Sequence, residues 1–280
     1  MRKKNLKVGI IGVGMVGGTL LRWFKRKKIK TFLYDKGKKL GSPQEVNKGE
    51  IIFICVPTPF KKEEGCDLSY LKEAISYIKG KKIVVIKSTV LPGTTEMFQK
   101  KFPNFKFLFN PEFLSEATAD KDFQHPDRQI VGYTQKSKKI AKEILKLLPR
   151  APFERIIPAT EAEMVKYFNN TFNAVKVIFA NQMYDLCQAI GIDYNRVMEC
   201  AAASKFIRTQ DHLHVFHKGY RGYGGKCLPK DIKALIRFGQ LKGVDLSLLK
   251  ITEKINQKLM KEQGIKDPEN PLKKKNERKS

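Results

Sequence analysis

The chain has 280 residues and a formal net charge of +27, with 55 lysine and arginine residues against 28 aspartate and glutamate residues. This length has room for a nucleotide-binding domain and a second, smaller domain. No segment approaches about 18 uninterrupted apolar residues, and no secretory apolar region precedes the first strand, so we expect neither a membrane span nor secretion.

The positive charge is dispersed lysine rather than a clustered arginine-rich surface. Only eleven of the 55 basic residues are arginine. Surfaces that recognise nucleic acid tend to gather arginine and aromatic side chains in one place. We therefore expect non-specific attraction of polyanions at low salt, and no specific nucleic-acid partner.

The cysteine pattern indicates reduced thiols. The chain has five cysteines, an odd number, without a CxxC pair: Cys55, Cys66, Cys187, Cys200 and Cys227. This spacing argues against a disulfide framework and a zinc site. We expect a cytoplasmic protein without a bound metal.

The first predicted elements carry a dinucleotide-binding signature. An apolar strand over residues 7–11 leads into a G-x-G-x-x-G run (Gly12, Val13, Gly14, Met15, Val16 and Gly17), which opens a helix. Free N–H groups at a helix N-terminus attract a pyrophosphate. A second strand, residues 31–34, ends at Asp35, where a carboxylate accepts hydrogen bonds from a ribose and repels a 2′-phosphate. The pattern predicts NAD as the cofactor rather than NADP.

Strands and helices continue to alternate through the first half of the chain. We expect strands at 51–56, 83–86, 106–109 and 129–132, with helices at about 68–78, from about 94, and at about 136–148. The pattern predicts an α/β fold with a Rossmann-type, doubly wound parallel sheet, in which ligands lie at the carboxyl ends of strands. Thr58, Thr89, Glu112 and Glu116 all follow strands, although turn chemistry alone would explain Thr58 or Thr89.

From about residue 160 the pattern becomes helical. Residues 161–190 contain neither proline nor glycine, and Lys166 and Asn170 are four residues apart, hence on one face. A solvated helix surface is the alternative for this pair. A shorter helix is expected at 194–203. The segment 208–223 holds three histidines, for which phosphate contact or solvent exposure is a simpler interpretation than metal binding.

The segment from Gly222 to Asp231 combines a glycine-rich turn with a thiol. The glycines let the backbone approach a ligand closely. Lys226 and Lys230 flank Cys227 with positive charge, which favours the nucleophilic thiolate. Asp231 adds a carboxylate that can orient a water or take a proton. A tight turn with a chance thiol is the alternative when this segment is considered alone.

Taken together, these motifs resemble those of the UDP-glucose/GDP-mannose dehydrogenase family. The matching pieces occur in family order and lie within residues 5–260: Gly12 to Gly17, Val56-Pro57-Thr58-Pro59, Lys87-Ser88-Thr89-Val90, Asn110 to Glu116, Lys166 with Asn170, and Gly222 to Asp231. The wider 6-phosphogluconate-type dehydrogenases share the glycine loop and the lysine–asparagine helix but lack the cysteine. Cys227 therefore distinguishes the two families.

The resemblance implies oxidation of the 6-hydroxyl of a nucleotide sugar to a carboxylate, with two NAD, one water and a cysteine-bound thiohemiacetal and thioester. The implied catalytic residues are Cys227, Lys166, Asn170, Asp231, Glu112, Glu116 and Thr89. The implied NAD contacts are the residues from Gly12 to Gly17, Asp35, Thr58, Thr89, Glu116 and Lys230. The implied sugar-nucleotide contacts are Glu112, Phe113, Leu114, Ser115, Glu116, Lys166, Asn170, Phe216, Tyr220 and Gly224. The sequence does not choose between Glu112 and Glu116 as the base that hydrolyses the thioester.

The expected organisation is a Rossmann domain at 1–157, an all-α central and linker region at 158–264 that dimerises, and a disordered basic tail at 265–280. Members of the family have a further domain that binds much of the nucleotide, whereas this sequence ends after the linker helix. Three explanations stay open: the missing domain is a separate chain, the substrate is smaller or bound differently, or the protein is a non-catalytic NAD-binding remnant. We expect a homodimer through the central helices.

Overall fold

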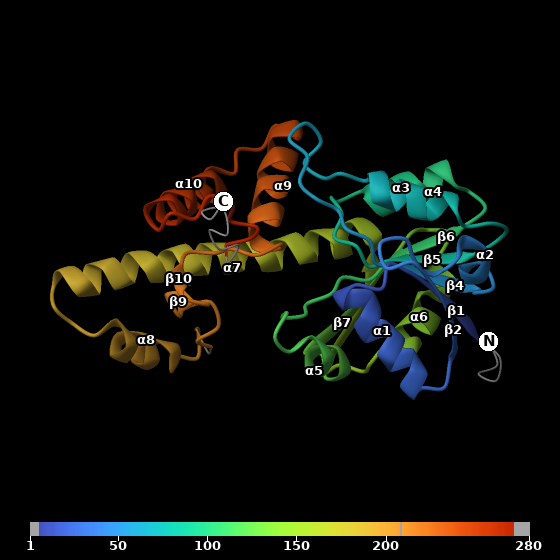
Figure 1. Cartoon of the computed structure of the whole chain (residues 1–280), viewed down its shortest axis with the longest axis horizontal. Helices are drawn as coiled ribbons and strands as arrows, with labels where there is room; N and C mark the ends of the chain where they lie inside the picture. The colour runs from blue at the N-terminus through green and yellow to red at the C-terminus, as the bar shows by residue number, and fades with distance from the viewer. Residues whose placement is uncertain (1–5, 208, 272–280) are drawn as a thin grey trace, which may run out of the picture. The chain divides into compact units, whose positions relative to one another are not determined.

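The computed structural model describes residues 6–207 and 209–271 (Figure 1). The chain divides into two compact units. The first comprises Met1–Pro59 and Cys66–Lys166, and the second comprises Phe60–Gly65 and Tyr167–Ser280. The boundary falls inside the long helix α7, Ala159–Ala189, so that one helix contributes residues to both units.

The first unit is built on an eight-stranded sheet in the order β3-β2-β1-β4-β5-β6-β7-β8. The strands are β1 Lys7–Ile11, β2 Lys30–Asp35, β3 Leu40–Gly41, β4 Ile51–Ile54, β5 Ile83–Ile86, β6 Lys106–Phe109, β7 Arg128–Tyr133 and β8 Phe153–Pro158. The helices are α1 Met15–Arg26, α2 Pro43–Val46, α3 Ser69–Ser76, α4 Thr94–Lys101, α5 Ala119–Gln124 and α6 Ala141–Leu147, the last preceded by a 3₁₀ turn, Lys138–Ile140. The predicted α/β Rossmann-type fold is confirmed.

The predicted parallel sheet includes two antiparallel pairs. β3 pairs antiparallel with β2, and β7 pairs antiparallel with β6, with Phe109 opposite Gly132. A parallel neighbour requires a crossover that returns the chain to the starting end of the strand. Between β6 and β7 the chain forms only the six-residue α5, so β7 begins near the end where β6 stops and runs back.

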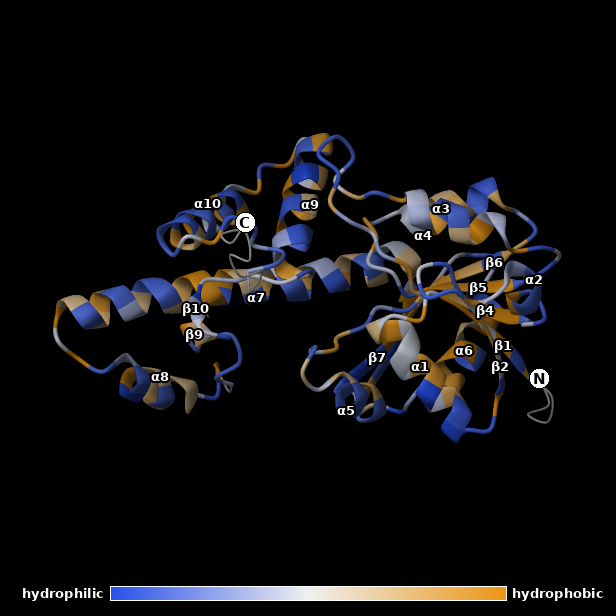
Figure 2. Ribbon diagram, in the orientation of Figure 1, coloured by the Kyte–Doolittle hydropathy of each residue, from blue (hydrophilic) through white to orange (hydrophobic). Residues whose placement is uncertain are grey.

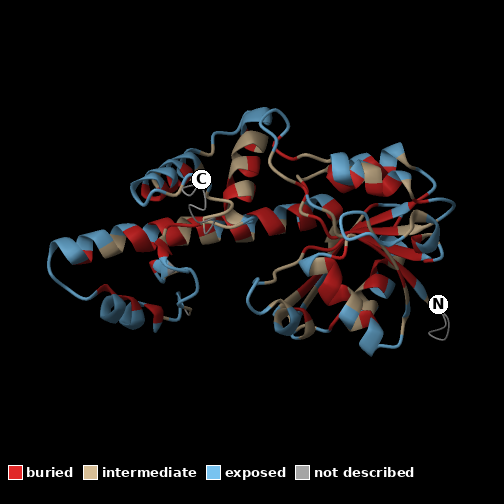
Figure 3. Cartoon of the chain, viewed as in Figure 1, coloured by how far each residue is buried: buried red, intermediate tan, exposed pale blue. Residues whose placement is uncertain are grey.

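Helices cover both faces of this sheet, and alternate strand residues supply the two cores. Ile52 and Ile54 of β4 belong to the cluster that contains residues of α3 and α4. Ile51 and Phe53 of the same strand belong to the cluster that contains residues of α1 and α6. Figures 2 and 3 show the consequence, strands that are both apolar and buried. Burial on both faces explains why the central strands β4 and β5 are continuous apolar runs.

A buried carboxylate joins the start of α7 to α4. Glu163 accepts hydrogen bonds from the backbone N–H groups of Gly93 and Thr95, at 2.6 and 2.8 Å, and from the Thr95 hydroxyl at 2.6 Å. These N–H groups belong to the start of α4, where backbone donors have no partner within the helix. Burial raises the pKa of Glu163 to about 7 despite these hydrogen bonds. The contacts hold the turn of α7 that also carries Lys166.

The second unit is mainly helical. Besides α7 it contains α8 Tyr194–Ala202, α9 Leu228–Leu241 and α10 Ser247–Glu262. Its core joins Ala174 and Ile178 of α7 to Ile232 of α9 and Leu259 of α10. The expectation of an all-α region is corrected by a short antiparallel hairpin, β9 Phe216–His217 and β10 Tyr220–Arg221. Gly219, with φ of +83°, supplies the turn conformation that the hairpin needs.

Part of the segment expected to form a basic tail, 265–280, lies within the described residues. Residues 265–271 are described, and within them the Pro268 carbonyl accepts a hydrogen bond from the Gly225 N–H at 2.8 Å. The rest of the expected disordered tail, 272–280, lies outside the described residues. Across the described part of the chain, no helix combines the length and the apolar character that a membrane span requires.

Candidate functional site

The glycine loop after β1 has the geometry of a dinucleotide-binding turn. Gly12 has φ of +86°, and a Cβ there would lie 2.5 Å from the Cys55 carbonyl oxygen. A Cβ on Gly17 would lie 1.9 Å from the Gly12 carbonyl oxygen, so this glycine allows α1 to pack against the turn. Gly14, the N-cap of α1, faces open space, and α1 has no acidic residue in its first turn. The loop therefore fits a pyrophosphate on the helix N-terminus.

Asp35 lies beside this loop at the end of β2. Its carboxylate accepts hydrogen bonds from the Val13 N–H at 2.6 Å and from the Lys38 N–H at 2.9 Å. Lys38 also donates from its Nζ atom to the Val13 carbonyl oxygen at 2.6 Å. Val13 belongs to the glycine loop, and Met15 and Val16 are the first residues of α1. The open glycine loop and the carboxylate beside it fit the adenosine half of NAD.

The glycines permit a paired test of the loop. Gly14→Ala should leave the free energy of unfolding within ~0.5 kcal/mol, because its Cβ meets open space. The same change should weaken NAD affinity at least ~10-fold, because the methyl group stands where the pyrophosphate approaches the backbone.

Gly17→Ala is the matched variant and should destabilise the fold by about 1–3 kcal/mol through overpacking against Gly12. Urea unfolding and NAD titration by calorimetry measure the two quantities. Equal unfolding midpoints for the two variants would contradict this interpretation.

Thr58 and Thr89 come together from two strand-end loops. The buried Thr58 hydroxyl donates to the Thr89 carbonyl oxygen at 2.5 Å. The first loop follows β4 and the second follows β5, and these strands are parallel neighbours. Both residues thus lie toward the carboxyl edge of the sheet, as the glycine loop and Asp35 do.

Lys166 and Glu112 form a buried ion pair within the first unit. Lys166 Nζ lies 2.9 Å from Glu112 Oε1 and also donates to the Glu112 carbonyl oxygen at 2.7 Å. The side chains are 5% and 10% exposed. Burial by itself raises the pKa of Glu112, but the charge of Lys166 and the Leu114 N–H bring it below its usual value. Glu112 is therefore a carboxylate at neutral pH, whereas Glu116 is exposed.

Lys87, which we did not predict as a site residue, lies behind this pair. Its buried Nζ donates to Asn110 Oδ1 at 2.5 Å, and Asn110 in turn donates to Gln129 and to the Ile130 carbonyl. Burial lowers the pKa of Lys87 to about 8, and the charge of Glu112 acts against this lowering. The sequence signal that could have indicated a role for Lys87 was its position immediately after β5. A lysine within Lys-Ser-Thr, however, does not by itself predict a buried side chain.

The remaining residues of the Asn110–Glu116 loop have backbone and stacking partners. The Leu114 N–H donates to Glu112 Oε2, and the Ser115 N–H donates to Asp122. The Phe113 ring has the Arg128 guanidinium 3.9 Å from its centroid. Arg128 is a second residue that sequence reasoning missed, since it lies at the start of β7, away from any motif.

Four predicted residues come together in the second unit. Asn170 Nδ2 donates to Asp231 Oδ2 at 2.6 Å, and Asp231 is 1% exposed. The Asp231 N–H donates to the Cys227 carbonyl oxygen at 2.9 Å, and Lys230 Nζ pairs with the other Asp231 oxygen. Cys227 is exposed and is the N-cap residue of α9. The N-terminus of α9 therefore adds positive potential to the thiol.

Cys55 contrasts with Cys227. It follows β4, and burial raises the pKa of its thiol to about 12, so that it stays protonated at neutral pH. Cys66 and Cys187 are buried, and Cys200 is exposed on α8. Of the exposed cysteines, Cys227 is the one that adjoins the Asn170–Asp231 pair.

The predicted sugar-nucleotide contacts of the second unit lie near the same loop. Phe216 is 58% exposed and meets Tyr184 edge to face, with ring centroids 5.6 Å apart. Tyr220 is buried, and its hydroxyl would lie 2.8 Å from a Cβ on Gly224. His212 and His214 are exposed. The described residues hold no cluster of histidine, cysteine, aspartate or glutamate able to bind a metal ion.

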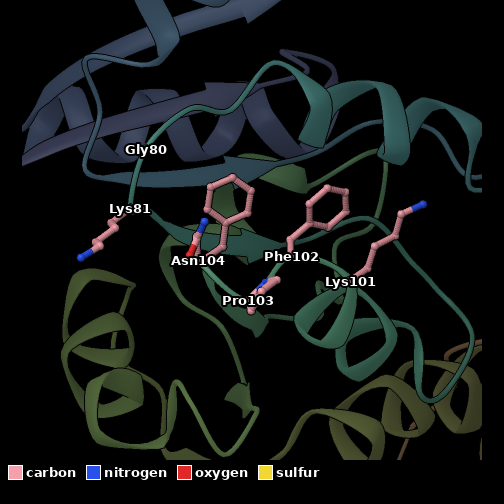
Figure 4. A pocket seen from close by; sticks show the side chains of 7 residues that line it. Gly80, Lys81, Lys101, Phe102, Pro103 and Asn104 are labelled. Atoms are coloured by element: carbon pink, nitrogen blue, oxygen red, sulfur yellow. The ribbon is translucent and has the colours of Figure 1, made fainter.

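A surface hollow of about 400 Å³ lies elsewhere in the first unit (Figure 4). It is lined by Gly80, Lys81, Lys101, Phe102, Pro103, Asn104 and Phe105. These residues precede β5 and β6, which begin at Ile83 and Lys106. The hollow therefore adjoins the amino ends of these strands, opposite the edge that carries the predicted site.

Two family models and several curated relatives match the sequence of this chain. Residues 38–148 match the NAD binding domain of the UDP-glucose/GDP-mannose dehydrogenase family, and residues 160–258 match the central domain of that family. UDP-glucose 6-dehydrogenase of Rickettsia bellii is 37% identical over 202 residues, which are 69% of this chain and 45% of the relative. GDP-mannose 6-dehydrogenase of Pseudomonas putida is 32% identical over 211 residues, with 69% and 47% covered.

A solved structure shows the same relation. The structure of a UDP-glucose dehydrogenase from Pyrobaculum islandicum aligns with a TM-score of 0.80 and 28% identity, covering 94% of this chain and 73% of that chain. The chain spans about half the length of the curated relatives it matches. The match to the NAD binding domain confirms NAD as the cofactor. The chain belongs to the UDP-glucose/GDP-mannose dehydrogenase family and carries its NAD-binding and central domains.

Proposed function

We propose that the chain oxidises the 6-hydroxyl of a nucleotide sugar, of the UDP-glucose type, to the uronic acid with NAD. The observation that carries this proposal is the pair of buried contacts made from one face of α7. Lys166 is bound to Glu112, and Asn170, one turn later, is bound to Asp231, whose backbone N–H donates to the carbonyl of Cys227. A base, a cationic donor and a nucleophile are the groups that such a reaction requires.

In the first oxidation the 6-hydroxyl loses its proton and a hydride, giving the aldehyde. Lys166 stabilises negative charge on the substrate oxygen, and Asn170 donates a hydrogen bond to the same oxygen. Asp231 takes the proton through water. NAD supplies the hydride acceptor for each of the two oxidations. The buried Lys166–Glu112 ion pair and the Asn170–Asp231 hydrogen bond hold both donors in place before the substrate arrives.

In the second oxidation Cys227 attacks the aldehyde carbon, forming a C–S bond and a thiohemiacetal. Loss of a second hydride and the hydroxyl proton leaves a thioester. Water then breaks the C–S bond and gives the carboxylate and the thiol. Four electrons leave the sugar for two NAD, and one water enters. We assign Glu112 rather than Glu116 as the group that orients this water, because Glu112 is buried and charged beside Lys166.

Cofactor choice provides one prediction. NAD should bind at least ~100-fold more tightly than NADP. The reason is that the Asp35 carboxylate would face the 2′-phosphate of NADP, and such a juxtaposition of like charges costs several kcal/mol. Lys36, the neighbour that would relieve this repulsion, pairs with Glu73 at 2.6 Å. Calorimetric titration measures both affinities, and Asp35→Asn should narrow the difference. Equal affinity of the wild-type protein for NADP would refute the prediction.

Incubation with UDP-glucose, GDP-mannose and related nucleotide sugars, followed by NADH absorbance and by mass spectrometry of the product, tests the proposed reaction. Two NADH per uronic acid is the expected result. NAD binding without turnover of any of these sugars would instead favour a non-catalytic NAD-binding subunit. In that case we would look among co-purifying proteins for a separate chain that grips the nucleotide.

Assembly provides a further prediction. Phe168, Phe172, Phe179 and Leu186 recur on one face of α7 and are 70%, 54%, 57% and 54% exposed in the single chain. Apolar patches of this kind mark protein interfaces. We propose a homodimer through residues 160–262.

Light scattering at micromolar concentration and moderate salt should give twice the chain mass. Phe172→Asp should give a folded monomer, and Val175→Asp, at a half-buried position, should weaken the dimer too. Gln188→Asp, an exposed position on another face of α7, is the matched control. A monomeric mass for the wild-type protein would defeat this proposal.

A further inference from the structure

The glycine-rich segment that leads to Cys227 is held at every second residue by the C-terminal part of the second unit. The backbone N–H groups of Arg221, Tyr223 and Gly225 donate to Gln263, Asn256 and Pro268, at 2.7, 2.8 and 2.8 Å. An extended segment normally obtains such alternate hydrogen bonds from a neighbouring strand. Here the amide side chains of Asn256 in α10 and of Gln263, the C-cap residue of α10, and one carbonyl take the place of that strand.

Asn256 makes the most enclosed of these contacts. Its Oδ1 accepts from the Tyr223 N–H at 2.8 Å, and its Nδ2 donates to the Tyr223 carbonyl at 3.0 Å. Asn256 is 1% exposed and Tyr223 is 2% exposed, so water does not compete for these groups. A Cβ on Gly222, which has φ of +86°, would lie 2.6 Å from Asn256 Oδ1. The glycine is thus required for the amide to reach the backbone.

The Tyr223 side chain is held by the same helix. Its hydroxyl donates to Glu253 Oε2 at 2.6 Å, and Glu253 Oε1 accepts from Gln257 at 2.8 Å. Glu253 lies three residues before Asn256, on the same face of α10, and is 7% exposed. One face of α10 therefore binds the backbone and the side chain of a single loop residue.

Gln263 repeats the arrangement two turns later. Its Oε1 accepts from the Arg221 N–H at 2.7 Å, and its Nε2 donates to the Arg221 carbonyl at 3.0 Å. Gln263 is exposed, and Arg221 also contacts Asn181 and Asp185 of α7 through its guanidinium. Replacement of Gln263 should therefore perturb the segment before Cys227 less than replacement of Asn256.

We propose that Asn256 is a positioning residue for the Cys227 thiol, with Glu253 and Gln263 in support. This proposal rests on the proposed role of Cys227 as the nucleophile. Gly224 and Gly225 lie between Tyr223 and Lys226, the residue before Cys227. A glycine segment has too much conformational freedom to hold a reacting atom in place by itself. The Asn256 contacts remove that freedom on one side of Cys227, and α9 removes it on the other.

The test compares Asn256→Ala, Asn256→Asp and Gln263→Ala in the full chain. Gln257→Ala is the matched control, because this exposed amide bonds within α10 to Glu253. Hydrogen exchange of the Tyr223 amide and iodoacetamide labelling of Cys227 at pH 7 are followed in each variant. Cys200, exposed on α8, serves as the reference thiol in the same molecule.

Asn256→Ala should speed exchange of the Tyr223 amide and lower the labelling rate of Cys227 about tenfold relative to Cys200, because the thiol is no longer held at the N-terminus of α9. With UDP-glucose as substrate, kcat should fall about 100-fold, the loss expected when a reacting group moves by about 1 Å, while the NAD dissociation constant stays within about twofold. Asn256→Asp, which keeps an acceptor for the Tyr223 N–H, should lie between wild type and Asn256→Ala. Gln263→Ala should change labelling in the same direction by less.

A Cys227 labelling rate in Asn256→Ala that equals that of Gln257→Ala would overturn the proposal. The same conclusion would follow if Gln263→Ala, which removes an exposed side chain, altered labelling more than Asn256→Ala. Exchange and labelling do not require turnover. A wild-type protein that turns over no sugar would therefore reject the proposed reaction while the positioning of the thiol is still measured.

Discussion

Replacing Cys227 by serine should abolish uronic acid formation, with a loss of at least ~10³-fold, because removal of a catalytic nucleophile leaves only binding and charge stabilisation. NAD affinity should stay within about twofold, since Cys227 is not one of the predicted NAD contacts, such as the glycine loop and Asp35. A serine hydroxyl at the same N-cap position keeps the helix start but is a far weaker nucleophile at neutral pH. Product analysis by mass spectrometry and NAD titration measure the two outcomes.

Cys200→Ser is the control, because Cys200 is the other exposed cysteine of the described chain and lies on α8. It should leave activity unchanged. Iodoacetamide at pH 7 should label Cys227 before the buried Cys66 and Cys187. Full activity of Cys227→Ser, or earlier labelling of a buried thiol, would show that another group carries the acyl intermediate.

The strands and long helices were predictable because each has a local cause. The run Ile51–Ile54 is apolar at every position and forms β4, buried on both faces. The proline-free stretch predicted as a helix over 161–190 forms α7, two residues earlier at its start and one residue shorter at its end. Local pattern therefore predicted which elements form, and their order along the chain placed the strand-end loops at one edge of the sheet.

What sequence reasoning missed depends on contacts between distant residues. The direction of β7 is set by the short connection after β6, whose α5 is too small to have been recognised. Burial of Lys87 depends on Asn110, which directly follows β6, and on Gln129 of β7. The contacts of Asn256 with Tyr223 join residues 33 positions apart, and an asparagine within a helix carries no local sign of them.

Substitutions of Glu112 and of Lys166 should both lower activity, but they should lower the stability of the fold by different amounts. Lys166→Met should lower kcat about 10²–10³-fold, the usual cost of removing one donor that stabilises developing oxyanion charge. It should also destabilise the first unit by about 3–5 kcal/mol, because it leaves the 10% exposed Glu112 carboxylate without its partner. Glu112→Gln should slow thioester hydrolysis and retain a neutral hydrogen-bonding side chain beside Lys166. Arg22→Met, which breaks an exposed ion pair with Asp120 in the same unit, is the control and should cost at most ~1 kcal/mol.

The pH dependence of the free energy of unfolding distinguishes the contribution of the Glu112–Lys166 ion pair from that of packing. The folded-state pKa of Glu112 is lowered from 4.5, mainly by the charge of Lys166 acting against burial. A carboxylate with a depressed folded-state pKa stabilises the fold above its unfolded value, and this stabilisation is lost as the pH falls through the folded-state pKa. The free energy of unfolding of the wild-type protein, minus that of Glu112→Gln, should therefore be constant near neutrality and decline below about pH 4.5. Urea titrations between pH 3 and pH 7 measure this difference. A difference that rises as the pH falls would mean that burial outweighs Lys166, and that Glu112 is held as the neutral acid.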